Sequence, residues 1–178
     1  MALSTLRKFL LNLIRDELGI NVIWANQNLP KLARPFATLR LYGSTERARA
    51  EIRPPAVTNG FRQVVTPTEA VLEVQLFGTK GTFPYDELER LVGRLSVDSV
   101  MNRCLSAGVA FYNDDGVQDI SGLLDDKQTF EQRAAVDLRI RFMKVLDDDS
   151  TDVDQVEITG THLDTRDDSP KTFIVNGG

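Results

Sequence analysis

Residues 133–142 alternate between apolar and polar side chains, and this run constrains the fold more than any other part of the sequence. Its polar positions include Asp137, Arg139 and Arg141. Its apolar positions are Ala134, Val136, Leu138, Ile140 and Phe142. Successive side chains of a strand point to opposite faces of a sheet. The run therefore predicts a long strand with one face in the core and a charged face outside it.

A second alternating run, residues 68–78, predicts another half-buried strand. Glu73 and Gln75 fall on its polar side. The apolar side consists of Ala70, Leu72, Val74 and Leu76. Shorter apolar runs predict strands over residues 22–24, 35–43 and 108–114, and residues 117–128 are expected to form a connecting segment.

Three stretches show the apolar spacing of amphipathic helices, namely residues 3–18, 85–95 and 97–108. In the first stretch, Ser4 or Thr5 is expected to cap the start, and Gly19 suits the left-handed residue just past the end. Its apolar stripe comprises Leu3, Leu6, Phe9, Leu10, Leu13, Ile14 and Leu18. The stripe predicts a helix that packs against the sheet.

Composition excludes several classes of protein. The chain has 178 residues, of which 42% are hydrophobic and 26% charged, as in ordinary globular domains. No apolar run is long enough for a transmembrane helix. The net charge of −5 disfavours a stand-alone nucleic-acid-binding protein, because such binding depends mainly on phosphate neutralisation. Polar residues interrupt the apolar N-terminal segment, so we expect no secretion signal and assembly in the cytoplasm.

The chemistry-bearing residues are sparse. Cys104 lies in an apolar helical pattern that predicts a buried, unreactive thiol, and His162 is the only histidine. The Gly78–Thr82 run lacks the spacing of a phosphate-binding loop, and the acidic run from Asp147 lacks that of a calcium loop. We therefore predict no catalytic, cofactor-binding or metal-ligating residue. A small-ligand or enzyme domain with an unrecognised site remains the alternative.

The charge distribution divides the chain near residue 146. Residues 147–178 hold nine acidic and two basic residues, so they carry −7 and leave +2 on residues 1–146. We therefore predict an α/β domain over 1–146 and an extended acidic arm over 147–178, which has too few apolar residues to form its own core. The arm is expected to contact other chains more than its own domain, and folding back along its own domain is the alternative. Its candidate contact residues are Val156, Ile158, Phe173 and Ile174.

The stretch 44–67 is basic and breaks the strand periodicity. It carries Arg47, Arg49, Arg53 and Arg62, and predicts a long hairpin or loop. Long loops in compact domains are uncommon and often functional, so these arginines are candidates for partner contact. A solvated connection is the alternative. Asp137, Arg139 and Arg141 on the outer face of the 133–142 strand are candidates for contact with another subunit.

Several short motifs, taken in order, carry a resemblance to a known family. The sequence resembles the neck and tail-terminator proteins of long-tailed phages over residues 1–146, and residues 147–178 take no part in the resemblance. The motifs are VIWANQN at 22–28, PFATLRL at 35–41, VQLFG at 74–78, AGVAF at 107–111, VQDI at 117–120 followed by Leu123-Leu124, and the strand 133–142.

The resemblance implies a structural role. It implies an α/β fold of the α+β type, in which about three helices pack on a mixed, mostly antiparallel sheet. It also implies a ring, usually of six subunits, that caps the head-proximal end of the tail tube and joins the tail to the neck. The partners would be further copies of the chain, the tail tube protein, neck or connector proteins, and the sheath protein as a further candidate. Genomic DNA would pass through the central hole without specific binding. Another head–tail adaptor or tube-capping protein is the alternative.

Overall fold

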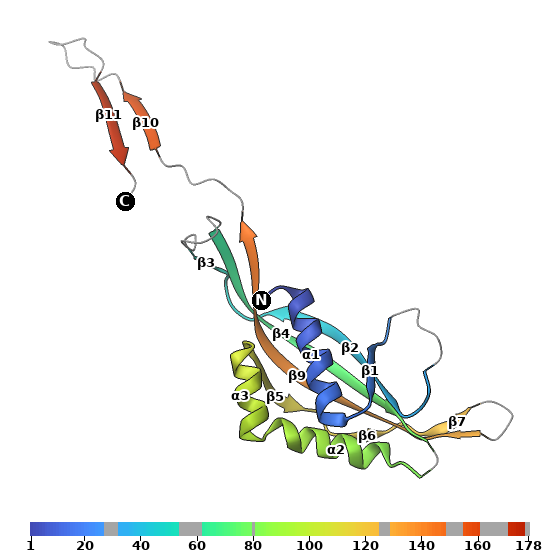
Figure 1. Ribbon diagram of the computed structural model, residues 1–178. Coiled ribbons are helices and arrows are strands. Elements are labelled where there is room, and N and C mark those ends of the chain that lie inside the picture. Colours follow the sequence, from blue (N-terminus) through green and yellow to red (C-terminus); the bar gives the residue numbers. More distant parts are fainter. Residues whose placement is uncertain are drawn as a thin grey trace.

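The centre of the fold is a mixed sheet built on two long antiparallel strands (Figure 1). The computed structural model describes residues 1–26, 32–53, 62–79, 81–124, 129–148, 155–160 and 171–176. Within these ranges, seven strands form the main sheet. The strands β4 (Arg62–Phe77) and β9 (Arg133–Asp148) pair along their whole length.

Shorter strands extend the sheet on both sides of this pair. Strand β2 (Phe36–Glu46) is antiparallel to β4, and β1 (Asn21–Trp24) is parallel to β2. Strand β3 (Glu51–Arg53) also pairs with β4, while β5 (Val109–Asp114) and β6 (Gln118–Asp119) pair with β9. The predicted mixed, mostly antiparallel sheet is therefore confirmed.

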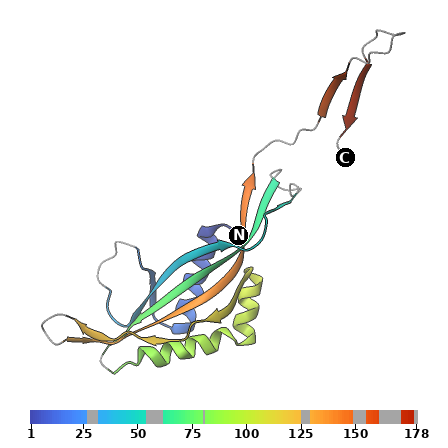
Figure 2. The same ribbon diagram turned by 180° about the vertical axis from the view of Figure 1, so that it is seen from behind.

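Helices α1 (Leu3–Leu18), α2 (Pro84–Leu95) and α3 (Asp98–Ser106) cover one face of this sheet, as Figures 1 and 2 show from opposite sides. The core lies between them, and it buries the alternating faces predicted for β4 and β9. Fully or almost fully buried core residues include Leu6, Leu10, Leu13 and Ile14 of α1, Leu72 and Val74 of β4, Leu88 and Leu91 of α2, and Val136, Leu138 and Ile140 of β9. Each large apolar side chain buried here stabilises the fold by roughly 1.5–3 kcal/mol before entropy is counted.

The first helix has the predicted range but not the predicted cap. Ala2 occupies the N-cap position without a side-chain cap, so the prediction of a cap at Ser4 or Thr5 is wrong. The chain terminus instead binds β9: the amino group of Met1 donates to the carbonyl of Met143 at 2.7 Å. A tertiary contact therefore sets the helix start. The end is as predicted, because Gly19 is left-handed with φ 67° and donates to Arg15.

Among its described residues, the stretch 44–67 is mostly strand, in agreement with the hairpin form of the prediction. Strand β2 continues to Glu46. Strand β3 and the first part of β4 pair as an antiparallel hairpin, and residues 54–61 between them lie outside the described ranges. Pro67 lies inside β4, where a missing N–H normally breaks a ladder. Its carbonyl accepts from Arg47 at 3.0 Å, so its ring nitrogen faces the gap between β2 and β3, where the partner strand changes. The proline therefore costs no ladder bond.

Two further departures concern the short strands. The segment 117–128 is not only a connection: it contains β6 and β7 (Gly122–Leu124), which pairs with β8 (Thr129–Glu131). In the acidic arm, β10 (Gln155–Gly160) and β11 (Lys171–Asn176) form a separate antiparallel hairpin, which lies away from the helices and the main sheet in Figures 1 and 2. Short strands of this kind have too few residues for a clear sequence period.

Candidate functional site

The face of the main sheet opposite the helices, here called the open face, carries most of the polar candidates. Side chains that pair across neighbouring strands share a face of the sheet. Glu69, Val71 and Glu73 of β4 pair with Arg141, Arg139 and Asp137 of β9, respectively. Their alternate neighbours Ala70 and Leu72 are buried in the core. The structure therefore brings Asp137, Arg139 and Arg141 onto one exposed surface, as predicted for the outer face of this strand.

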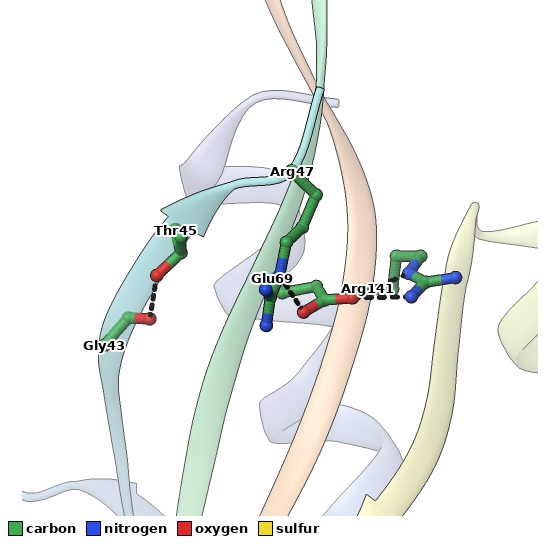
Figure 3. A network of polar contacts seen from close by, with 5 residues as sticks. All are labelled: Gly43, Thr45, Arg47, Glu69 and Arg141. Carbon is green, nitrogen blue, oxygen red and sulfur yellow. Dashed lines mark hydrogen bonds and ion pairs between the residues drawn. The ribbon is translucent and has the colours of Figure 1, made fainter. Parts of the chain in front are cut away.

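Glu69 is the centre of a charged cluster on the open face (Figure 3). Arg141 donates from Nη2 and Nε to one carboxylate oxygen, at 2.5 and 3.1 Å. Arg47 donates from Nε to the other oxygen. The two guanidinium groups cover the carboxylate, so that Glu69 is only 6% exposed. Arg141 also stacks on the ring of Tyr112, 5.2 Å from its centroid.

This cluster controls the charge state of Glu69. The hydrogen bond from Arg141 lowers the pKa of the carboxyl, burial opposes that effect, and the hydrogen bonds from Tyr112 and Arg47 lower the pKa further. Glu69 therefore stays ionised and holds the end of β2 against β4 and β9. Arg47 and Arg141 thus bind their own chain, and removal of either leaves the buried Glu69 with one guanidinium partner instead of two.

A second polar group lies next along the same face. The hydroxyl of Tyr42 donates to Asp137 at 2.7 Å, and this hydrogen bond, together with burial, raises the pKa of Tyr42 to about 12. Arg40 lies 5.4 Å from the centroid of the Tyr42 ring and 3.9 Å from a carboxylate oxygen of Glu73. These contacts join β2, β4 and β9 across the open face.

Arg139 is the most loosely held charge of the three candidates on β9. Its only ion pair among the described residues is with Asp115, at 3.5 Å, and both side chains are more than 40% exposed. Exposed pairs of this kind contribute about 0–1 kcal/mol. The outer end of the Arg139 guanidinium is therefore available to a partner, whereas its Nε is buried and has no hydrogen-bond partner among the described residues.

The other candidates of the basic stretch do not join the open-face clusters. Arg49 and Arg53 are exposed, and Arg53 lies 3.3 Å from Glu51 on the same strand. The backbone of Arg62 pairs with Asp148 at the end of the sheet, and its side chain lies outside the described part of the structure. Among the described side chains of the basic stretch, that of Arg47 shares its partner, Glu69, with Arg141.

The candidates in the acidic arm meet one another through the backbone of their hairpin. Val156 pairs with Val175, and Ile158 pairs with Phe173. Ile174 lies opposite Glu157, on the other face of the hairpin. The strand tendency of Val156 and Ile158 is thus confirmed, whereas their contact with another chain stays a prediction.

The described residues contain no group of three or more His, Cys, Asp and Glu side chains placed to hold a metal ion. Cys104 is buried as expected, and burial raises the pKa of its thiol, which disfavours the reactive thiolate. His162 lies outside the described residues. Among the helices that the structure describes, none is long and apolar enough to cross a membrane.

Sequence reasoning missed Glu69, Tyr42 and Tyr112 as parts of this surface. All three stand at positions where an isolated strand would be solvated, so nothing in their spacing distinguishes them. The signal is the register between β4 and β9, which places Glu69 opposite Arg141. That register depends on tertiary pairing and was not available from a single strand pattern.

Comparison with known proteins identifies the family. The family model described as phage neck terminator protein matches residues 3–166. This match extends past residue 146, so the predicted limit of the resemblance at residue 146 is wrong. The family pattern includes the end of β9 and the first part of the acidic arm. No curated protein matches the chain. The chain belongs to the phage neck terminator protein family and is a structural component of the virion at the junction of tail and neck.

Proposed function

We propose that the protein assembles into a ring, of six subunits by family resemblance, that caps the head-proximal end of the tail tube and joins it to the neck. Its partners are further copies of itself, the tail tube protein and the neck or connector proteins. In this proposal it acts by assembly and not by catalysis. The family match supports the tail–neck role.

The observation that carries the ring proposal is the open face of the sheet. All three helices pack on the opposite face, and the open face presents charged side chains from β2, β4 and β9. Closed rings need two different surfaces that meet between neighbours. A face on which Arg139 lies near the ordered Glu69 cluster suits one of these surfaces, because most of its charges are already ordered before association.

Ion pairs between arginines and carboxylates of the same chain also affect how the ring would interact with DNA. Arg47, Arg141 and Arg53 each have a carboxylate partner in their own chain. A guanidinium that is already neutralised by a carboxylate gains less from a phosphate, and the whole chain carries −5. We propose that genomic DNA passes through the central hole without specific binding.

We also propose that two parts of the chain have different roles in assembly. Residues 1–146 form the ring body, and residues 147–178 form an arm that contacts other chains. The exposed arginines of the β2–β3 region, Arg49 and Arg53, face the tail tube or a neighbouring subunit in this arrangement. Their position near the end of the long strands, away from the core, supports this assignment (Figure 1).

Reversal of one exposed charge tests the ring surface. Arg139→Glu should leave a folded chain, because the ion pair that it removes is exposed and contributes about 0–1 kcal/mol, and should weaken self-association and tube capping. Arg90→Glu is the matched control: Arg90 also makes an exposed ion pair, with Glu87, but lies on α2 on the opposite side of the sheet. Oligomer mass in solution and capping of assembled tubes are the two measurements. Normal assembly of the Arg139→Glu chain would show that the open face is not part of the interface between subunits.

A separate pair of variants tests the tube contact. Arg49→Glu with Arg53→Glu should reduce binding to tail tube protein and leave the oligomer mass unchanged. Binding is measured by co-sedimentation with tubes. Unchanged co-sedimentation would show that the basic stretch does not contact the tube.

A further inference from the structure

An apolar groove lies beside the edge of the main sheet, between α3 and β5. It encloses about 160 Å³, and its lining includes Met101, Cys104, Leu105, Val109 and Phe111. Met101 is 41% and Leu105 65% exposed, whereas Cys104 and Val109 form the buried floor. Large exposed apolar side chains that gather around a groove mark an interaction surface. The groove needs an apolar occupant.

Strand β5 offers backbone groups at the same place. It pairs with β9 along one edge, and no strand pairs with its other edge in the part of the chain that the structure describes. An open edge presents unpaired N–H and C=O groups that can accept another strand. A strand added to β5 would lie along the groove, with alternate residues at positions facing α3.

The hairpin of β10 and β11 has a complementary pattern. Its register places Val156 opposite Val175 and Ile158 opposite Phe173. Cross-strand partners share a face, so these four apolar positions fall on one face of the hairpin. A two-stranded hairpin is at best marginally stable by itself in water, because it cannot cover such a face. The hairpin therefore needs a surface to pack against, and it lies away from its own body (Figure 2).

We propose that the C-terminal hairpin of one copy docks on the groove between α3 and β5 of a neighbouring copy, and adds a strand to the β5 edge. The charges favour this occupant: residues 147–178 carry −7 and residues 1–146 carry +2. Two arms therefore repel each other, whereas an arm and a body attract. This inference rests on the proposed self-assembly and names the contact that links one subunit to the next.

Disulfide trapping between two full-length chains tests the contact. Both chains carry Cys104→Ala, one adds Met101→Cys and the other adds Phe173→Cys, and the two differ in tag size. Mild oxidation of the mixture should give a heterodimer that only a contact between chains can produce. Leu105→Glu in the groove chain should lower its yield about tenfold or more, because it places a charge in an apolar contact. Leu123→Glu, at a residue 70% exposed on β7 and outside the groove, should leave the yield unchanged.

A single chain with both cysteines separates the remaining outcomes. If it forms only an internal disulfide, and the mixture gives no heterodimer, the hairpin docks on its own body and the proposal is overturned. If neither sample forms a cross-link, the groove is not the docking surface. Oligomer mass and tube capping of the Cys104→Ala chain are measured in parallel. Rings that cap tubes without the heterodimer would refute only this contact, whereas chains that neither associate nor cap tubes would refute the proposed function itself.

Discussion

Truncation of one core side chain gives the most direct energetic test of the fold. Leu138 of β9 is 2% exposed and pairs with Leu72 of β4, which is fully buried. Leu138→Ala removes three carbon atoms from the core, which costs about 2.4 kcal/mol at about 0.8 kcal/mol for each buried methylene-sized group. The cavity left between the sheet and the helices adds to this loss. We expect a total loss of about 3–4 kcal/mol in the free energy of unfolding.

Urea denaturation measures this loss, at one fixed protein concentration because self-association would add to the apparent stability. With a slope of about 2 kcal/mol per molar urea, the midpoint should fall by about 1.5–2 M. Leu146→Ala is the matched control, since Leu146 lies on the same strand but is 53% exposed, and it should cost less than about 1 kcal/mol. Equal losses for the two variants would contradict the burial of Leu138 in the core.

Three further predictions follow from local features of the structure. The pKa of Glu69 is lowered in the folded chain, so its contribution to stability is present above the pKa of the unfolded chain and is lost as the pH falls. The urea midpoint of Glu69→Gln should therefore change less than that of the wild type between pH 7 and pH 3. An identical acid dependence would show that the Arg47 and Arg141 contacts do not form. Tyr42 has its pKa raised to about 12 chiefly by Asp137, so Asp137→Asn should increase the phenolate absorbance at pH 11, and no increase would count against that hydrogen bond. Gly19→Ala should destabilise α1 by about 1 kcal/mol because Gly19 has a left-handed backbone, whereas Gly93→Ala inside α2, where space is open, should stabilise the chain by about 0.5–1 kcal/mol. Thermal melting measures both effects, and a shift of the same sign for the two variants would refute the argument.

The long elements were predictable because each has one face in the core. Leu72 and Val74 of β4, and Leu138 and Ile140 of β9, are buried at every second position, which is the pattern visible in the sequence. Most residues of the α1 stripe are buried in the same way, except that Leu3 at the helix start is 48% exposed and Phe9 is only partly buried. Burial of one face requires apolar residues at a regular spacing, and this spacing in the sequence identifies the helix or strand.

The features that escaped prediction depend on contacts between distant segments. The start of α1 is set by Met1 on β9, and the burial of Glu69 is set by two arginines that are 22 and 72 residues away in the chain. The tolerance of Pro67 inside β4 depends on a change of partner strand beside it. Local spacing carries no information on such contacts, because they arise only when the sheet is assembled. The open-face residues were therefore predicted as a charged face, but not as an ordered network.

The central claim is that this protein caps the tail tube as a ring, and electron microscopy of tubes assembled with the full chain tests it most directly. The chain carries a gold-labelled tag and is added to growing tail tube protein, with Arg139→Glu and Arg90→Glu run beside it. The account predicts one labelled ring at a single end of each tube, arrested tube growth, and loss of both with Arg139→Glu but not with Arg90→Glu. Label spread along the tubes, or tubes that grow unlabelled in the presence of a monomeric chain, would contradict it.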